Sequence, residues 1–518
     1  IKYRRTGGGE KMKYLLSTEQ MRELDRRTIK ECNLSSRILM ETAGKGCADL
    51  LVREFPAQME NGILILCGNG NNGGDGAVLA RWLHHYGYVV TLVNIQLGNL
   101  SSETKTNFAI CQSLGIKVHK VKSEKHLSWL KEMVSMHSMV VDAIFGIGFK
   151  GELEPWLKEL FFYISAFAEF KVALDIPSGL NADTGNTEMA IWVDATLCIA
   201  NLKLGHIIGL GREICGKLYI VDIGIPALFY EDDDNYVRLF TEKDFFPPIR
   251  ISTYHKNDYG KVYIFGGISG YTGASIMAAR AALRAGCGYA FVLYRKRLMS
   301  IYSVKLTEAL NQPIPENPED NLPDEQALQD ILSNATAVLI GPGLGKDEFA
   351  RKLLEITIKY VDLPLVIDAD GLNLLAENPD LYPYLAKPNV LITPHWGEFI
   401  RLAKIEKSDL QADCLRELKA FVDKYQAQVL LKSHFSIFCN REEIWVNISG
   451  NDGLATGGSG DVLSGIITSF LAQGLSISEA AINASYLLGA TAEKLAKKRA
   501  TASILPSDII DNLFIKDL

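Results

Sequence analysis

The sequence predicts an α/β protein with two consecutive domains. Short apolar runs alternate with helix-length segments along most of the chain, a pattern typical of a parallel sheet covered by helices on both faces. The alternation stops once, at a charge cluster in residues 230–236 (YEDDDNY) and a proline pair in residues 245–250 (FFPPIR). The chain of 518 residues is 47% hydrophobic, which is enough to bury two cores. We therefore expect domains at residues 1–235 and 236–518.

Charge and cysteine content narrow the class of function. The formal net charge of −7 argues against a nucleic-acid-binding protein, since phosphate neutralisation needs clustered Lys and Arg. The nine cysteines are scattered singly, without a C-x-x-C pair or a disulfide-like spacing, which indicates a reducing compartment. No segment has the apolar length of a membrane span or a signal peptide. We expect a cytoplasmic protein that acts on small molecules, without nucleic-acid or membrane partners, in which residues 1–11 form a tail before Met12.

Each domain has its own series of buried strands. The apolar runs of the first domain are GILILC (62–67), VVTLVNI (89–95), MVVDAIFG (139–146), KVALDIPSG (171–179), ATLCIA (195–200) and KLYIVDIG (217–224). Those of the second domain are KVYIFGG (261–267), YAFVLY (289–294), AVLIGPGLG (337–345), LPLVIDADGLN (363–373), NVLITPHWGE (389–398), QVLLKSH (428–434) and EIWVNI (443–448). The turn motifs after these runs differ between the domains, so the second is not a repeat of the first.

The glycine-rich stretch GNDGLATGGSGD (450–461) lies between a predicted strand and an apolar helix. Backbone N–H groups at a helix N-terminus lack intrahelical acceptors, and glycine lets the main chain approach an anion closely, so a phosphate fits this turn. Asp461 would then lie close enough to a terminal phosphate to take a proton from an attacking hydroxyl. From this stretch alone, a carboxylate that only caps the helix explains Asp461 equally well.

Four further motifs favour the catalytic explanation, because they fall where strands end, the edge at which open α/β sheets bind ligands. They are GPGLG (341–345), DADGLN (368–373), TPHWGE (393–398) and LKSH (431–434). Together with YTGA (271–274) and GGSGD (457–461), the motifs GPGLG, DADGLN and TPHWGE resemble, in this order, those of NAD(P)H-hydrate dehydratases, a ribokinase-like family, over residues 245–518.

This resemblance implies a mechanism and a set of binding residues. Asp461 would be the base that activates the substrate hydroxyl, which ADP or ATP phosphorylates in the presence of magnesium before phosphate leaves. The implied nucleotide-binding positions are Lys432, Ser433, His434, Phe435, Ser436 and Gly460. The implied contacts to the hydrated cofactor come from Ala274, Gly343, His395 and Asp461.

Two positions depart from the family pattern. Trp396 in TPHWGE stands where the family usually has Pro, and would either crowd the substrate or stack on one of its rings. Asn257 stands where Gly is common. Neither departure removes a residue of the proposed chemistry. His395 has a second explanation, as a loop residue that caps a helix.

In the first domain, GNGNNGGDG (68–76) follows a strand, opens a helix and matches the G-x-G-x-x-G spacing of dinucleotide-binding turns. Such turns are followed about twenty residues later by an acidic residue for the ribose. The next strand ends in TLVNIQLGN without Asp or Glu, which disfavours NAD-dependent hydride transfer. The Walker-like spacing of GREICGKL (211–218) ends in Leu218 and leads into a strand, so we reject a P-loop there.

NNGGDG (71–76), DAIFGIG (142–148) and DIPSGLNADTG (175–185) together resemble NAD(P)H-hydrate epimerases, with a Rossmann-like three-layer fold, over residues 15–230. The resemblance implies a potassium ion held by Asn72, Asp142 and Ser178, whose oxygens suit a hard cation. Asp175 would do acid/base work during inversion at the hydrated carbon, although a loop-bracing carboxylate is an equal alternative. The implied substrate contacts are Asn71, Asn72, Gly73, Gly74, Asp75, Gly146, Ile147, Gly148, Phe149, Lys150, Gly151, Glu152 and Asp175.

The two resemblances describe one task. Hydration of a nicotinamide ring gives two epimers, and a dehydratase that acts on one of them needs an epimerase to supply it. We therefore expect a bifunctional metabolite-repair enzyme, both isomerase and lyase, that forms a homo-oligomer. Two rivals stay open: a ribokinase-like small-molecule kinase with a non-catalytic N-terminal domain, and a binding or scaffold role for the first domain. The sequence does not choose between ADP and ATP, or between NADHX and NADPHX.

Overall fold

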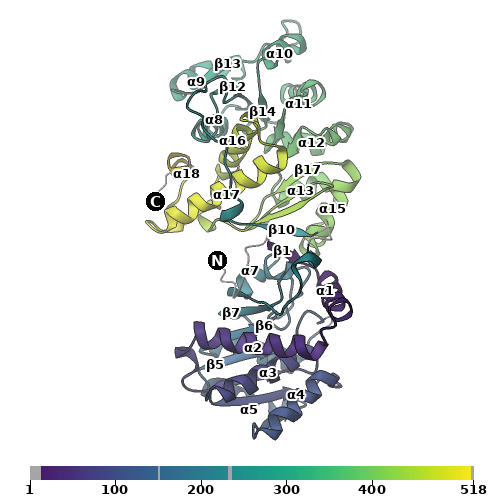
Figure 1. Ribbon diagram of the computed structural model, residues 1–518. Helices are drawn as coiled ribbons and strands as arrows, with labels where there is room; N and C mark the ends of the chain where they lie inside the picture. Colours follow the sequence, from purple (N-terminus) through teal and green to yellow (C-terminus); the bar gives the residue numbers. More distant parts are fainter. Residues whose placement is uncertain (1–12, 150–151, 231–235, 515–518) are drawn as a thin grey trace. The chain divides into compact units, whose positions relative to one another are not determined.

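A computed structural model of the chain describes residues 13–149, 152–230 and 236–514 (Figure 1). The chain divides into two compact units, Ile1–Val237 and Arg238–Leu518, and strand β10 (Val237–Phe240) contains the division. Each unit combines a largely parallel sheet with helices, so the predicted α/β class is confirmed. Among the described residues, no helix has both the length and the apolar character needed to cross a membrane.

The first unit is built on a seven-stranded sheet in which every neighbouring pair is parallel. Its strand order is β4-β3-β2-β5-β6-β7-β9. The strands are β2 (Ile63–Cys67), β3 (Val90–Ile95), β4 (Val118–Val121), β5 (Met139–Ala143), β6 (Phe170–Leu174), β7 (Ala195–Ile199) and β9 (Lys217–Val221). Two short strands outside this sheet, β1 (Lys13–Leu16) and β8 (Leu202–Lys203), pair with each other in parallel.

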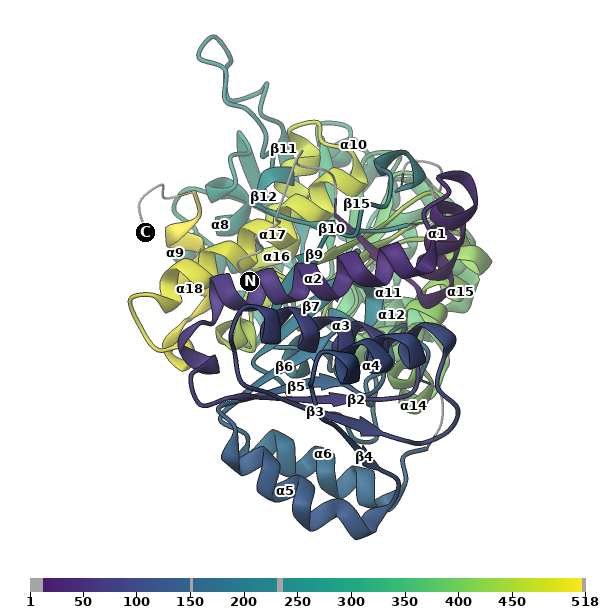
Figure 2. The ribbon, with the colours of Figure 1, turned by 60° about the horizontal axis from the view of Figure 1, so that its bottom comes forward.

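Helices cover both faces of this sheet (Figure 2). Alternate residues of β2 face opposite ways: Ile63 and Ile65 pack with α2, α3 and α4, whereas Leu64 and Leu66 pack with α5 and α6. Continuous apolar strands are therefore required here, because each strand is buried on both sides. The helices are α1 (Thr18–Glu31), α2 (Ser36–Glu54), α3 (Asn71–His85), α4 (Ser102–Ser113), α5 (Leu127–Met136), α6 (Pro155–Phe167) and α7 (Gly211–Ile214).

The second unit has nine strands in the order β13-β12-β11-β14-β15-β16-β17-β18-β19. The first seven in this order pair in parallel, and β17, β18 and β19 pair antiparallel. The strands are β11 (Lys261–Phe265), β12 (Tyr289–Tyr294), β13 (Leu310–Pro313), β14 (Ala337–Ile340), β15 (Leu365–Ile367), β16 (Val390–Ile392), β17 (Gln428–Leu431), β18 (Ser436–Cys439) and β19 (Ile444–Asn447). The apolar run before the glycine-rich stretch is therefore an antiparallel edge of a largely parallel sheet.

Small residues let two helices of the second unit approach each other closely. A Cβ at Gly465 in α16 (Ser459–Ala472) would lie 2.3 Å from the carbonyl oxygen of Ala278 in α8 (Thr272–Arg284). Both helices bury apolar residues against one face of the sheet. Glycine at this crossing thus fixes where α16 begins relative to the strand ends. The other helices are α9 (Met299–Lys305), α10 (Glu325–Leu332), α11 (Glu348–Tyr360), α12 (Asp370–Glu377), α13 (Trp396–Ala403), α14 (Lys407–Ala412), α15 (Cys414–Tyr425), α17 (Ile477–Ala496) and α18 (Pro506–Asn512).

Candidate active sites

In the first unit, the turn between β2 and α3 is packed tightly against the end of β5. A Cβ at Gly68 would lie 1.9 Å from the carbonyl oxygen of Ile144, and one at Gly73 would lie 2.1 Å from the carbonyl oxygen of Gly68. Only glycine permits these approaches. The close packing brings the first turn of α3, which carries Asn72 and Asp75, to the edge where β5 and β6 end.

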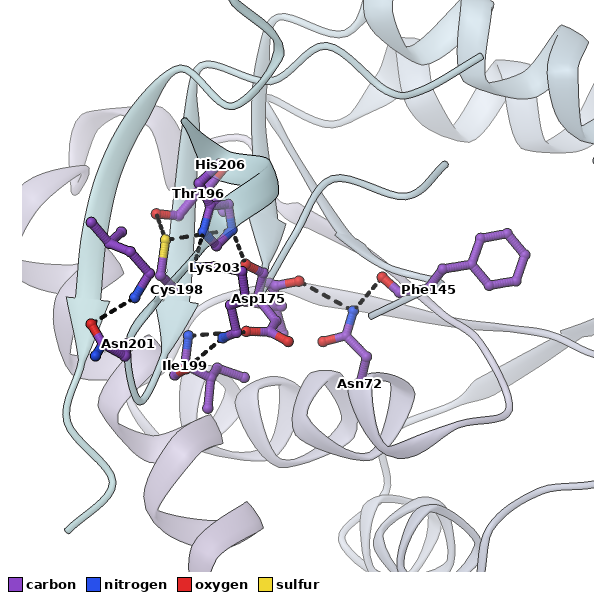
Figure 3. Close-up of polar contacts among 11 residues, drawn as sticks. Asn72, Phe145, Asp175, Thr196, Cys198, Ile199, Asn201, Lys203 and His206 are labelled. Carbon is purple, nitrogen blue, oxygen red and sulfur yellow. Dashed lines mark hydrogen bonds and ion pairs between the residues drawn. The ribbon is translucent and has the colours of Figure 1, made fainter. Parts of the chain in front are cut away.

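Three side chains with oxygen atoms meet at that edge. The Asp142 carboxylate accepts hydrogen bonds from the Ser178 hydroxyl at 2.5 Å and from the Ser178 backbone N–H at 2.7 Å. Asn72 Nδ2 donates to the carbonyl oxygen of Phe145 at 2.9 Å, a carbonyl that lies 3.4 Å from the Ser178 hydroxyl (Figure 3). Asn72 Oδ1 is buried and has no hydrogen-bond partner among the described residues. Burial raises the pKa of Asp142 to about 6, although the hydrogen bonds from Ser178 act against this shift.

Asp175 forms a buried ion pair just after β6. Its backbone is in the left-handed region, with φ of 64°, which is uncommon for a residue other than glycine and is often found at functional sites. Lys203 Nζ forms an ion pair with Asp175 Oδ1 and also donates to the carbonyl oxygen of Ile199 at 2.7 Å (Figure 3). The side chain of Lys203 is 1% exposed and that of Asp175 is 12% exposed. The cation is thus enclosed, while the carboxylate reaches the surface of the site.

Two more carboxyl groups belong to this charge cluster. Burial raises the pKa of Asp75 well above its ordinary value, and the neighbouring Asp175 and Asp25 raise it further. Burial also raises the pKa of Asp25 in α1 to about 6, while the charge of Lys203 lowers it. Since one ammonium cannot neutralise three carboxylates, at least one of them favours its protonated form. This arrangement can both accept and donate a proton.

The positions that we predicted as substrate contacts differ in burial. Lys150 and Gly151 lie outside the described residues. Gly73 and Gly74 are buried in the first turn of α3, whereas Asn71 and Glu152 are exposed. Next to the loop with Phe149 is a cavity of about 260 Å³, and its lining residues are Phe149, Leu153, Gly179, Asn181, Asn186, Thr187, Glu188 and Met189.

Helix α1 supplies residues that the sequence analysis missed. Arg22 Nη2 would lie 3.6 Å from a Cβ at Gly148, so a cation stands beside the predicted substrate loop. Asp25, on the same helix, belongs to the charge cluster. Lys203 was also missed. Its place shortly after the apolar strand β7 is the signal that could have found it, because ligands bind where such strands end.

In the second unit, Asp461 lies in the first turn of α16, after Gly458 with φ of 105°. Burial raises the pKa of Asp461 to about 7, and the nearby Asp368 raises it further, while Lys432 lowers it. Lys432 Nζ donates to Asp368 Oδ1 at 2.7 Å and would lie 3.4 Å from a Cβ at Gly460. A carboxyl group that titrates near neutral pH is suited to accept a proton from a substrate hydroxyl.

Asp368 and Glu398 are acidic residues that the sequence analysis quoted within motifs but gave no role. Asp368 follows β15 and is 1% exposed, and Glu398 in α13 is 6% exposed. Burial raises the pKa of Glu398, and Lys432 lowers it. Burial lowers the pKa of Lys432, but the neighbouring Asp368, Glu398 and Asp461 together raise it above its ordinary value. Lys432 is therefore charged and surrounded by carboxyl groups.

His395 caps α13 and lies next to Lys432. Its Nδ1 accepts the backbone N–H of Gly397 at 3.0 Å, and its own backbone N–H donates to Glu398 at 2.8 Å. His395 pairs with Lys432 in an isolated parallel bridge, and its side chain is 55% exposed. Burial and the charge of Lys432 lower the pKa of His395. The imidazole is thus a neutral helix cap whose ring is still accessible from the site.

The remaining predicted positions fall into two groups. Gly343, with φ of 59°, would place a Cβ 3.3 Å from the Cβ of Ala274, so these two predicted substrate contacts are neighbours. In the turn between β17 and β18, Ser433 and His434 are exposed and Phe435 is 2% exposed. The Ser433 hydroxyl donates to the backbone carbonyl oxygen of Phe435 at 2.7 Å and accepts its backbone N–H at 3.3 Å, so Phe435 shapes the turn from within.

The two departures from the family pattern have different settings. Trp396 is the first residue of α13, and its Nε1 is buried without a hydrogen-bond partner among the described residues. Asn257 lies in an exposed turn before β11, where its carbonyl oxygen accepts the backbone N–H of Gly260 at 3.3 Å. Asn257 thus belongs to a turn, whereas Trp396 stands beside the capping histidine of the site.

Comparison with known proteins gives two family matches and full-length relatives. A family model described as NAD(P)H-hydrate dehydratase matches residues 262–514, and one described as YjeF-related protein N-terminus matches residues 36–205. The bifunctional NAD(P)H-hydrate repair enzyme of Moorella thermoacetica is 35% identical over 96% of both chains. The enzyme of that name from Coxiella burnetii is 33% identical over 97% of this chain and 99% of its own.

A solved structure is also similar to part of the chain. It is an ADP/ATP-dependent NAD(P)H-hydrate dehydratase from Bacillus subtilis, 25% identical, with a TM-score of 0.45. The similarity covers 53% of this chain and 95% of that one.

Proposed function

The chain belongs to the family of bifunctional NAD(P)H-hydrate repair enzymes, and on this premise we propose that its two units carry out the two reactions of that repair. The first unit interconverts the R and S epimers of hydrated NADH and NADPH. The second unit dehydrates the S epimer to NAD(P)H with ADP or ATP as co-substrate. The observation that carries the proposal is the full-length similarity to relatives with this name, and a charge cluster at the strand ends of each unit supports it.

In the second unit, Asp461 accepts the proton of the substrate hydroxyl. The hydroxyl oxygen then attacks the terminal phosphorus of the nucleotide, and the bond from that phosphorus to the bridging oxygen breaks. The phosphate ester loses inorganic phosphate, which leaves with the C–O electron pair, and the adjacent carbon releases a proton as the ring double bond forms. The pKa of Asp461, about 7, supports this role, because a base works best when its pKa is near the working pH.

The nucleotide phosphates bind at the N-terminus of α16. Free backbone N–H groups and the helix dipole favour an anion there, and Lys432 Nζ beside Gly460 adds a positive charge. Magnesium accompanies the nucleotide, since phosphate oxygens are its usual ligands. Gly343, Ala274 and His395 contact the hydrated cofactor.

In the first unit, Asp175 accepts the proton of the hydroxyl group on the hydrated carbon as the bond from that carbon to the ring nitrogen breaks and its electron pair passes to nitrogen, and returns the proton when the bond re-forms with the opposite configuration. Inversion leaves the composition of the substrate unchanged, so every proton that the protein takes must be given back. A carboxyl group such as Asp75, whose pKa is raised, can supply the proton that Asp175 does not hold. The start of α3, Asn71–Asp75, and the segment Gly146–Glu152 hold the phosphates and riboses of the substrate.

Asn72, Asp142 and Ser178 would hold potassium in this unit. An amide oxygen, a carboxylate and a hydroxyl are hard ligands, and the buried Asn72 Oδ1 has no other partner among the described residues. When bound, the ion would supply positive charge beside the Asp142 carboxylate. The residues present therefore fit the ion.

The proposed function is tested by the return of reduced-nicotinamide absorbance. Purified protein is mixed with both epimers of NADHX, magnesium, potassium and either ADP or ATP. Full recovery is expected with at least one nucleotide and identifies the donor, and a parallel series with NADPHX gives the cofactor preference. Recovery that stops at one epimer would contradict the epimerase. A stable phosphorylated product without release of phosphate would favour a small-molecule kinase instead.

The proposal includes the cellular compartment and the oligomeric state of the enzyme. The nine cysteines are all free, eight of them buried, which accords with a reducing compartment such as the cytoplasm. A homo-oligomer is expected, and light scattering of the purified protein would test it.

A further inference from the structure

Lys203 is enclosed in the first unit with its charge directed at Asp175. It is the last residue of β8, its side chain is 1% exposed, and Nζ contacts the Asp175 carboxylate and the carbonyl oxygen of Ile199. Burying an ammonium group is costly unless it is paired and hydrogen-bonded. Both conditions are met here, because Asp175, the proposed acid/base group, forms the ion pair and the carbonyl oxygen of Ile199 accepts a hydrogen bond.

His206 fixes the distance between the two members of the pair. Its Nδ1 accepts the backbone N–H of Lys203 at 2.9 Å, and its Nε2 donates to the backbone carbonyl oxygen of Asp175 at 2.8 Å (Figure 3). One ring nitrogen accepts while the other donates, which requires the neutral imidazole. Burial lowers the pKa of His206 to about 4, in agreement with this form. The imidazole therefore bridges the backbones of Lys203 and Asp175.

Five other titratable groups lie around Asp175 and Lys203. They come from α1, α2, α3, β7 and the 3₁₀ helix Leu204–His206, and are Asp25, Cys47, Asp75, Cys198 and His206. Two are carboxyl groups, and burial raises the pKa of both. The cysteines and the histidine are buried and neutral at physiological pH. Lys203 is thus the cation that pairs with the Asp175 carboxylate.

We propose that Lys203 is the positioning residue of the epimerase, which holds the Asp175 carboxylate through Oδ1 and directs its free oxygen towards the substrate. Among the described residues, hydrogen bonds to the Asp175 carboxylate reach only Oδ1, from Lys203 and from the backbone N–H of Ile199 at 3.3 Å. Oδ2 is left for the hydrated carbon. This inference rests on the proposed epimerase function of the first unit. It gives a role to Lys203, which lies outside the motifs NNGGDG, DAIFGIG and DIPSGLNADTG.

The test compares Lys203→Met with Lys203→Arg in the full chain. Conversion of R-NADHX to the S epimer is followed by chromatography without nucleotide, over a range of pH. In Lys203→Met we expect kcat to fall about a hundredfold at neutral pH with KM little changed, because the carboxylate loses the group that orients it. Lys203→Arg keeps the positive charge and should keep the wild-type profile. Thermal unfolding followed by circular dichroism reports whether each variant is folded, and nucleotide-dependent dehydration of S-NADHX reports that the second unit is intact.

Two controls separate the possible failures. Lys217→Met changes an exposed lysine at the start of β9 and should alter neither activity. If Lys203→Met does not fold, His206→Phe tests the same link, and should lower the epimerase kcat without raising KM. A wild-type protein that does not epimerise would overturn the proposed function. If the wild-type protein epimerises and Lys203→Met has an unchanged kcat and pH profile, the role of Lys203 alone is overturned. If Lys203→Met does not fold, an unchanged kcat and pH profile in His206→Phe has the same meaning.

Discussion

Both units place a lysine and several carboxyl groups where parallel strands end, but they pair them differently. In the first unit Lys203 contacts Asp175, the proposed acid/base residue itself. In the second unit Lys432 contacts Asp368, and Asp461, the proposed base, is left with a pKa of about 7. A direct ion pair favours the charged form of a carboxyl group. Burial beside a lysine that is paired elsewhere instead leaves the pKa of the carboxyl group raised. The same residue types therefore hold one proposed acid/base carboxylate in a direct ion pair and leave the other without one, with its pKa raised to about 7.

The largest effect is expected from Asp461→Asn. The amide cannot accept the hydroxyl proton, so nucleotide-dependent dehydration should fall by about 10³-fold or more, while epimerisation is unchanged. Release of phosphate measures dehydration and conversion of R-NADHX measures epimerisation, both on the same sample. Asp452→Asn, an exposed neighbour in the same glycine-rich stretch, serves as the matched control. Loss of both activities in a folded Asp461→Asn protein would rule out separate sites.

Asp175→Asn should have the converse effect. Epimerisation should fall by about 10²- to 10³-fold, since the acid/base group is lost, and dehydration of the S epimer should keep its rate. With a mixed-epimer preparation, the absorbance should then recover only to the level set by the S epimer and by slow uncatalysed exchange. Asp222→Asn changes an exposed carboxylate at the end of β9 and should leave recovery complete. Full recovery at the wild-type rate in Asp175→Asn would show that another group does the proton transfer.

The pH profiles should differ between the reactions. Asp461 must be ionised to act as a base, so dehydration should decline as the pH falls through about 7. Lys432 lowers the pKa of Asp461, and Lys432→Met should therefore move this limb to higher pH and cost about a hundredfold at neutrality. Initial rates of phosphate release against pH measure both changes, with Lys424→Met as an exposed control. An unshifted limb in Lys432→Met would mean that Asp461 does not set it.

The smallest effect concerns potassium. Replacing potassium by a bulky monovalent cation should slow epimerisation about tenfold and leave dehydration with magnesium and nucleotide unaffected. Asn72→Ala removes one proposed ligand and should weaken the response of epimerisation to potassium. Titration of each activity with potassium chloride at constant ionic strength distinguishes the two units. Equal dependence of both reactions on potassium would contradict a site confined to Asn72, Asp142 and Ser178.

Much of the architecture could be predicted because it depends on local pattern. Apolar runs of strand length formed strands buried on both faces, and the glycine-rich stretches at 68–76 and 450–461 opened helices. Carboxyl ends of parallel strands share one edge of a sheet, so chemical groups at those ends were expected together. The antiparallel β18 was not foreseen, since a four-residue turn after β17 decides it.

The sequence by itself determined the fold class, the family and the edge at which each set of reactive groups lies. Only the tertiary structure decided which ammonium meets which carboxylate. Lys203 and Asp175 are 28 residues apart, and Lys432 and Asp368 are 64 apart. Helix α1 also brings Asp25 to the first cluster from outside the matched family segment. The physical reason is that such contacts depend on strand order and on the path of the connections, which no short stretch of sequence specifies.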